Sequence, residues 1–270
     1  MASEVPGSVR PPAVAGTFYP DDPARLAAAV RGYLAEARGE QAPDDSPPKA
    51  VIAPHAGYVY SGPIAASVYA RLAAAAGRVE RVVLLGPAHR VALSGLAASS
   101  ARAFATPLGE VPVDGAALER VLALPQVSTL DAAHAHEHSL EVQLPFLQEI
   151  LGDFSLVPLV VGEASAEEVA EVLELLWGGP ETLIAVSSDL SHYYDYATAQ
   201  RMDRATTRAI ESLQPDAIDT EQACGRVPVQ GLLVAAARRG LRARTVDLRN
   251  SGDTAGSRDE VVGYGAYVFQ

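Results

Sequence analysis

Residues 50–70 read AVIAPHAGYVYSGPIAASVYA, and this stretch decides the fold. It opens with four small or branched apolar residues, as a buried strand does, then passes through Pro54 and His55 into an apolar run of helical spacing. Similar β-branched runs alternate with Ala-, Leu- and Glu-rich runs along the rest of the chain. This alternation predicts an α/β layer fold with crossover connections.

The same reading places the elements along the chain. We predict strands at Ala50–Ala53, Val82–Leu85, Ser155–Val161, Thr182–Ser187, Ala243–Leu248 and Val261–Phe269. We predict helices at Pro23–Glu36, Pro63–Ala75, Ala116–Leu124, Leu140–Leu151, Ala166–Leu176, Ala197–Ser212 and Val229–Arg239. The one clear break in composition, the Pro- and Asp-rich segment Gly39–Lys49, is too close to the N-terminus to separate two folding units. We therefore expect residues 1–270 to form a single domain.

Composition excludes several classes of protein. With 49% apolar and 20% charged residues, a chain of 270 residues can bury a large core, which excludes disorder as its main state. Its net charge of -12 repels phosphate backbones and anionic lipids, so we expect no nucleic-acid or membrane partner. We see no membrane span and no signal-peptide pattern in the sequence, and we therefore expect a cytoplasmic location. The single cysteine, Cys224, excludes an internal disulfide and an all-thiolate metal site.

Histidines fall just after predicted strands. His55 follows the strand that ends at Ala53, His89 follows the next strand through a Gly-Pro turn, and Asp189 and His192 follow the strand at 182–187. In open α/β sheets, ligands bind beyond the carboxyl ends of the strands. One such histidine is more often a hydrogen-bonded loop residue, but three at equivalent positions favour a common site.

A fourth loop, NSGD at residues 250–253, follows the predicted strand at 243–248 in the same way. Read alone, it is simply a good turn. Together with the histidines, its Asp253 would complete a site of two histidines and one carboxylate, which leaves open positions on Fe(II) for substrate and oxygen. Zinc accepts the same ligands, so the sequence does not choose the metal.

The segment HAHEHSLEVQLPFL carries three histidines and then a helical stripe of leucines. His138 and Glu141 are one turn apart and can face the same side, so we assign both to substrate binding. The alternatives are a helix start capped by Ser139, or a metal-scavenging tract, which the adjoining apolar helix disfavours. Tyr58 and Tyr193 belong to a group of tyrosines near these loops and could line an aromatic pocket, although tyrosines also commonly bridge core and surface.

Two further readings are weaker. A hydrolase triad of Ser187, Asp189 and His192 lacks the G-x-S-x-G elbow and would crowd into one loop. Cys224 has no adjacent histidine in the sequence and is predicted to be a buried or helix-end thiol rather than a nucleophile.

Several motifs, in order along nearly the whole chain, resemble the Memo-like family, whose prokaryotic branch is also called AmmeMemoRadiSam system protein B. They are RPPAVAGTFYP (10–20), APHAGYVYSGP (53–63), LLGPAHR (84–90), EHSLEVQLPFL (137–147), SSDLSHY (187–193), and NSGDTAG (250–256) with VVGYG (261–265).

This resemblance implies a single-domain, three-layer α/β/α sandwich around a central mixed sheet, similar to the class III extradiol dioxygenases. It implies that His55 and His89 are metal ligands, that Asp253 falls in the segment of the third ligand, and that His192 is the acid/base. Fe(II) is the metal it favours, with copper or zinc as alternatives. It also implies a pathway shared with an AMMECR-type protein and a radical-SAM protein.

Three hypotheses follow. The first is a metal-dependent, dioxygenase-like oxidoreductase acting on an aromatic or chelating small molecule, with His192 moving the proton and Asp189 orienting it. The second is a module that binds metal or an acidic or phosphorylated peptide without turnover, for which Arg90 and a metal would have to offset the net charge. The third is a zinc-type hydrolase.

Overall fold

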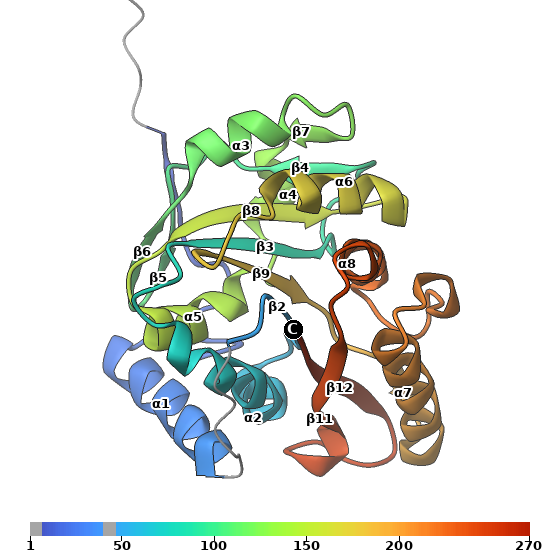
Figure 1. Cartoon of the computed structure of the whole chain (residues 1–270). Coiled ribbons are helices and arrows are strands. Elements are labelled where there is room, and N and C mark those ends of the chain that lie inside the picture. The colour runs from blue at the N-terminus through green and yellow to red at the C-terminus, as the bar shows by residue number, and fades with distance from the viewer. Residues whose placement is uncertain (1–6, 40–46) are drawn as a thin grey trace, which may run out of the picture.

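The computed structural model describes residues 7–39 and 47–270 (Figure 1). A central mixed sheet has the strand order β10-β12-β2-β9-β3-β8-β4-β7, with β11 paired to the outer side of β12. Its strands are β2 (Ala50–Ala53), β3 (Arg81–Pro87), β4 (Leu96–Ala98), β7 (Val127–Thr129), β8 (Ser155–Val161), β9 (Thr182–Ser187), β10 (His192–Tyr194), β11 (Ala243–Asn250) and β12 (Val261–Phe269).

Helices cover both faces of this sheet, as Figure 1 shows. One layer holds α1 (Pro23–Gly39), α2 (Tyr58–Tyr69), the 3₁₀ turn Ala70–Ala75 and α5 (Leu144–Leu151), and the other holds α3 (Gly115–Val121), α6 (Ala166–Leu176), α7 (Tyr196–Glu211) and α8 (Arg226–Arg238). Two hydrophobic clusters, one on each side of the sheet, pack these layers against it. The predicted α/β fold with two helical layers is confirmed.

Strand direction places the site. β2, β9, β3 and β8 are parallel, so their carboxyl ends lie along one edge of the sheet. β12 runs antiparallel to β2, and β11 runs antiparallel to β12, so β11 ends at that same edge. The loops after β2, β3, β9 and β11 therefore meet, as expected for an open α/β sheet.

Long elements agree with the sequence prediction and short ones were missed. The strands at 155–161, 182–187 and 261–269 and the helix at 166–176 have the predicted bounds, and Ser165 and Glu168 form a capping box at the start of that helix. The helix predicted from Pro63 begins earlier, at Tyr58, whose N–H donates to Phe18 O. The first turn of the helix predicted at 140–151 is a 3₁₀ turn at 141–143. The missed pieces are short: the small sheet of β1 (Val9–Arg10), β5 (Ala103–Thr106) and β6 (Gly109–Pro112), strands β4, β7 and β10, helix α4 (Asp131–Ala135), and 3₁₀ turns at 215–217 and 251–253.

Lys49, the single lysine of the chain, joins two neighbouring strands. Its Nζ donates to the carbonyl oxygens of Trp177 (2.5 Å), Gly179 (2.8 Å) and Thr182 (2.6 Å), so it ties the start of β2 to the turn before β9. Most of the Gly39–Lys49 segment lies outside the described residues.

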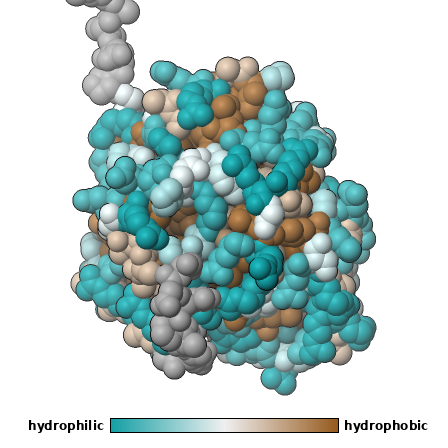
Figure 2. Space-filling model, in the orientation of Figure 1, coloured by the Kyte–Doolittle hydropathy of each residue, from teal (hydrophilic) through white to brown (hydrophobic). Residues whose placement is uncertain are grey.

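The outer surface is mainly polar. Figure 2 shows one face on which hydrophilic residues predominate and hydrophobic residues appear in separate patches. Within the described parts of the chain, no helix combines the length and the hydropathy that crossing a membrane requires.

Candidate metal centre

Three histidines from three segments converge at the carboxyl edge of the sheet. His55 follows β2, His89 follows β3, and His138 lies between α4 and the 3₁₀ turn at 141–143. One ring nitrogen from each lies within 4.8 Å of the others, which makes the three a possible metal-binding group. Their ring centroids are 4.7–5.5 Å apart. The predicted pair His55 and His89 is therefore joined by His138, which the sequence analysis had assigned to substrate binding.

His55 is held by a buried serine hydroxyl. Ser187 Oγ donates to Ser139 O (2.6 Å) and accepts from Gln143 Nε2 (2.8 Å). Since the one hydroxyl proton is thus used, Ser187 Oγ accepts from His55 Nδ1 at 2.8 Å. The proton of the neutral imidazole then sits on Nδ1, and the Nε2 lone pair is left for a ligand.

His89 is held by a buried carboxylate. Glu137 accepts from His89 Nδ1 (2.8 Å) and from the His89 backbone N–H (2.6 Å), and also from the N–H groups of His138 and Ser139. Burial would raise the pKa of Glu137, but the His89 imidazole and these backbone donors outweigh it and lower the pKa to about 2. A carboxylate that orients a ligand histidine in this way is a common partner of metal sites.

His138 supplies the third imidazole ring of the cluster. Its ring stacks on His89 and lies against Phe18, with centroids 4.7 Å apart in each case. Its buried Nδ1 makes no hydrogen bond within the described chain. This nitrogen lies 3.4 Å from Glu137 Oε1, so the carboxylate is close enough to attract a proton or cation but does not satisfy the nitrogen with a good hydrogen bond.

The electrostatics favour neutral rings. Burial lowers the pKa of His55 well below its usual value, and the neighbouring His89, His138 and His192 lower it further. Burial likewise lowers the pKa of His138 to about 4. At neutral pH both rings therefore present lone pairs, and a metal ion would not have to displace protons from them.

Cys224 is the residue that sequence reasoning missed. It lies just before α8, and its Sγ is 3.2 Å from His55 Nε2. Burial raises the pKa of this thiol, so the thiol proton can donate to the free His55 nitrogen. No local pattern signals this contact, because 169 residues separate the two in the chain. Its sulfur stands beside the histidines as a further potential ligand of soft character.

A cavity of about 700 Å³ opens over the histidines. Its lining includes all three rings together with Asp189, His192 and Tyr193. Arg90 and Glu260 bring one charge of each sign to its wall. The volume suits a small organic molecule.

Asp189 and His192 both face this cavity but do not form the expected pair. Asp189 Oδ1 accepts from the His55 N–H at 2.7 Å, and its Oδ2 lies 4.0 Å from His55 Nε2. Burial raises the pKa of Asp189 to about 7. His192 Nδ1 instead donates to Leu190 O at 2.8 Å, which leaves Nε2 available, and burial lowers the pKa of His192. Asp189 thus holds the His55 segment, and a backbone carbonyl orients His192.

Asp253 is not brought into the histidine group. Its Oδ1 accepts from the Tyr196 hydroxyl (2.6 Å) and its Oδ2 from the Asn250 N–H (3.1 Å), as part of a capping box around a 3₁₀ turn. The loop does border the cavity, through Ser251, Gly256, Ser257 and Glu260. The loop after β11 therefore lies at the cavity, as strand topology predicts. The Asp253 carboxylate, however, accepts hydrogen bonds within its own turn and from Tyr196.

Tyr58 and Glu141 are buried supports that do not line the cavity. The Tyr58 hydroxyl donates to Val142 O at 2.7 Å. Glu141 pairs with Arg10 and accepts from the N–H groups of Ala13 and Val14 and from the Tyr19 hydroxyl. These contacts join the RPPAVAGTFYP motif to the histidine segment. Of the four residues assigned to substrate binding, His138 and Tyr193 reach the cavity.

Comparisons with known proteins agree with this arrangement. The family model described as "Memo-like protein" matches residues 10–268. A "MEMO1 family protein" from Archaeoglobus fulgidus is 40% identical over 97% of this chain and 100% of its own length. Proteins of the same description from Aquifex aeolicus and Aeropyrum pernix are 37% and 38% identical, over 97% and 96% of this chain and 99% and 98% of their own.

Proposed function

The chain belongs to the Memo-like family, and from that premise we propose that it is a metal-dependent oxidoreductase in which His55, His89 and His138 hold a first-row transition ion. Iron(II) is our first choice of metal and copper our second. The substrate we infer is a small chelating or aromatic molecule.

One observation carries the proposal. Two of the three rings have one nitrogen fixed by a buried acceptor, Ser187 for His55 and Glu137 for His89, and so aim the opposite nitrogen at a common point. The third ring, His138, has a buried nitrogen with no hydrogen-bond partner within the described residues. Imidazole donors suit iron, copper and zinc, and the nearby Cys224 sulfur, a soft donor, is the reason that copper is our second choice.

A bound ion would lower the pKa of water or substrate hydroxyls at the cluster. The chain's own residues would then handle the proton. His192 keeps Nε2 free toward the cavity and is not one of the three clustered rings, so we assign it the acid/base role. Asp189 keeps the His55 backbone in place and lies on the same wall.

The cavity wall supports a substrate with a polar, chelating end. Arg90 would face an anionic oxygen, and the rings of Tyr60 and Tyr193 at the wall would cover a planar body. The cavity of about 700 Å³ is a better fit for a metabolite-sized molecule than for a folded partner.

Metal content tests the proposal. We expect His55→Ala, His89→Ala and His138→Ala each to lose most of the bound metal after anaerobic purification, because two imidazoles bind far more weakly than three. His136→Ala is the matched control, since His136 lies in the same tract, is exposed and is outside the cluster. Full metal content in all three cluster variants, measured by elemental analysis, would refute the site.

A zinc hydrolase is the second candidate, because three histidines with an open position also form a catalytic zinc site. The identity of the metal separates the two. Iron or copper after gentle purification supports the oxidoreductase, and stoichiometric zinc with hydrolysis of small amides or esters supports the hydrolase.

A further inference from the structure

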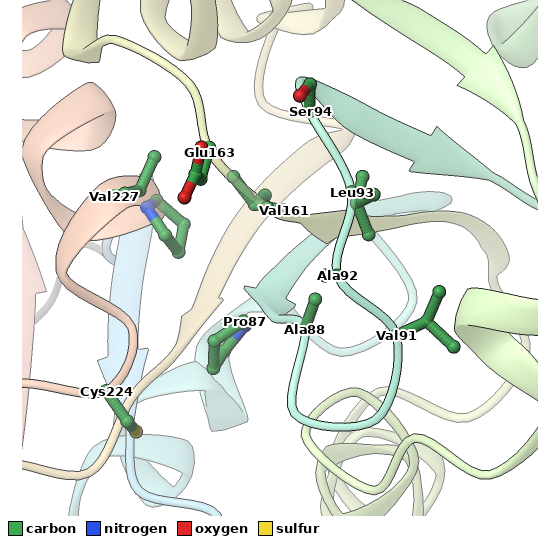
Figure 3. Close-up of a pocket in the computed structure, with 12 residues that line it drawn as sticks. Pro87, Ala88, Val91, Ala92, Leu93, Ser94, Val161, Glu163, Cys224 and Val227 are labelled. Carbon is green, nitrogen blue, oxygen red and sulfur yellow. The ribbon is translucent and has the colours of Figure 1, made fainter.

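A second cavity, of about 480 Å³, lies at the carboxyl edge of the sheet, where β3 and β8 end (Figure 3). It is enclosed by the loop after β3, the end of β8, and the start of α8 with the residue Cys224 that precedes it. Nothing in the proposed function uses this cavity.

The two cavities share a wall. In the loop after β3, His89 and Arg90 line the metal cavity, whereas Ala88 and residues 91–94 line the second cavity. Cys224 lines the second cavity, while its Sγ lies 3.2 Å from Nε2 of His55, which lines the first. A molecule in the second cavity would therefore lie against the residue whose thiol contacts a metal-site histidine.

The wall of the second cavity is preformed. Ala88 N donates to Val161 O (3.0 Å) and Glu163 N donates to Leu93 O (2.9 Å), so backbone hydrogen bonds lock the loop to the end of β8. At Gly162 a β-carbon would come within 2.1 Å of Leu93 O, which shows how closely the two backbones approach. A fixed wall lowers the entropy lost when a ligand binds.

The lining defines the chemistry of the occupant. Its lining residues are mainly of apolar type, among them Ala88, Ala92, Leu93, Val161, Val227 and Pro228, while backbone atoms and Ser94 add polar surface. Glu163 is the charged residue of the lining; it is exposed to solvent, and its carboxylate makes no hydrogen bond or ion pair within the part of the chain that the structure describes. Figure 3 shows this carboxylate between Val227 and the strand that ends at Val161. An apolar wall with one unpaired anion suits a small cation with an apolar body.

We propose that the second cavity binds a small organic ammonium ion, with its apolar body against Leu93 and Val227 and its charge at Glu163. Its occupancy changes the surroundings of Cys224 and, through that sulfur, of His55.

Benzylammonium is the probe we would titrate into the full chain, with binding followed by two-dimensional NMR of the backbone and histidine rings. We expect saturable shifts at Leu93, Glu163 and Cys224 and a smaller shift at the His55 ring. Neutral benzyl alcohol should bind roughly two- to fivefold more weakly, because an ion pair at an exposed carboxylate contributes little more than that factor.

Three variants locate the site. Glu163→Gln should weaken benzylammonium roughly two- to fivefold. Ala92→Trp, at an exposed position of the lining, should fill the space and weaken binding about tenfold or more. Glu260→Gln removes the same charge from the metal cavity and should leave the affinity for benzylammonium in the second cavity unchanged. Absence of saturable binding, unchanged affinity in Glu163→Gln and Ala92→Trp, or a loss confined to Glu260→Gln would each overturn the proposal. None of these outcomes depends on which metal the histidines hold.

Discussion

The two walls of the metal cavity differ in what directs their side chains. On the histidine wall, buried partners from other segments, Ser187 and Glu137, hold His55 and His89 with their free nitrogens toward one point. On the opposite wall, formed by the loop after β11, Asp253 is satisfied by its own turn and by Tyr196. Strand topology brings a loop to the site, but local hydrogen bonds decide which of its side chains face the cavity.

The sharpest test concerns His192, which lies at the cavity but is oriented by a backbone carbonyl and not by a buried side chain. We expect His192→Ala to keep its metal and to lose a factor of roughly 100 to 10,000 in rate, the usual share of general acid/base catalysis. Oxygen consumption by iron-loaded protein with a panel of catechols measures the rate, and elemental analysis measures the metal. Loss of metal from His192→Ala would instead identify His192 as a metal ligand, and no residue would then be assigned the acid/base role.

Glu137 and Asp253 compare the two walls directly. Glu137→Gln should weaken metal binding roughly 10- to 100-fold, because the carboxylate accepts from His89 Nδ1 and so orients the opposite ring nitrogen toward the metal. Asp253→Asn, the matched change on the other wall, should leave the metal affinity unchanged. Competition with a chelator gives both affinities. Should Asp253→Asn weaken metal binding as much as Glu137→Gln, the carboxylate would be a ligand in the metal-bound protein after all.

The segment before His192 is held by a buried carboxylate, Asp203, whose contribution to stability should depend on pH. Its buried carboxylate accepts from Ser191 N, and burial raises its pKa to about 6. A folded state that holds the proton more tightly than the unfolded chain becomes less stable as pH rises from about 4 to about 6. Between about pH 4 and pH 7, the parent should therefore lose on the order of 2 kcal/mol relative to Asp203→Asn. Urea unfolding of both proteins at the two pH values measures the difference, and parallel pH profiles would contradict it.

Tyr193 represents the exposed rim, where we expect the smallest effect. It has a φ of 61°, which bulky residues rarely adopt, and its side chain is 72% exposed. Tyr193→Gly removes the backbone strain without losing much buried area, so the free energy of unfolding should rise by up to about 1 kcal/mol. Chemical denaturation provides the value, with Tyr194→Gly as the control at a neighbouring residue of negative φ. A clear destabilisation by Tyr193→Gly would show that its ring packs on the fold.

The sequence predicted the long elements and the edge where the site lies, because hydrophobic period and strand direction are local and topological signals. It did not predict the strands β5 and β6, because their sequences AFAT and GEVP lack the adjacent β-branched residues that marked the equally short β2, AVIA. It also could not predict which side chains meet. His138 joins the cluster and Cys224 touches His55 through contacts between segments far apart in the chain. Asp253 was predicted to be a ligand because the pattern NSGD suits both a hydrogen-bonded turn and a loop that offers a carboxylate to a metal.

Lys49 has a practical consequence for experiments on this protein. All three N–H bonds of the single lysine ammonium are donated to backbone carbonyls in the folded chain. Lys49 is half-buried, and burial lowers its pKa to about 8, so acylation at mildly alkaline pH should be limited mainly by the loss of these three bonds when β2 separates from the turn before β9. The rate of its acylation, followed by mass spectrometry, would report the local opening of the central sheet from one natural residue, with no label introduced.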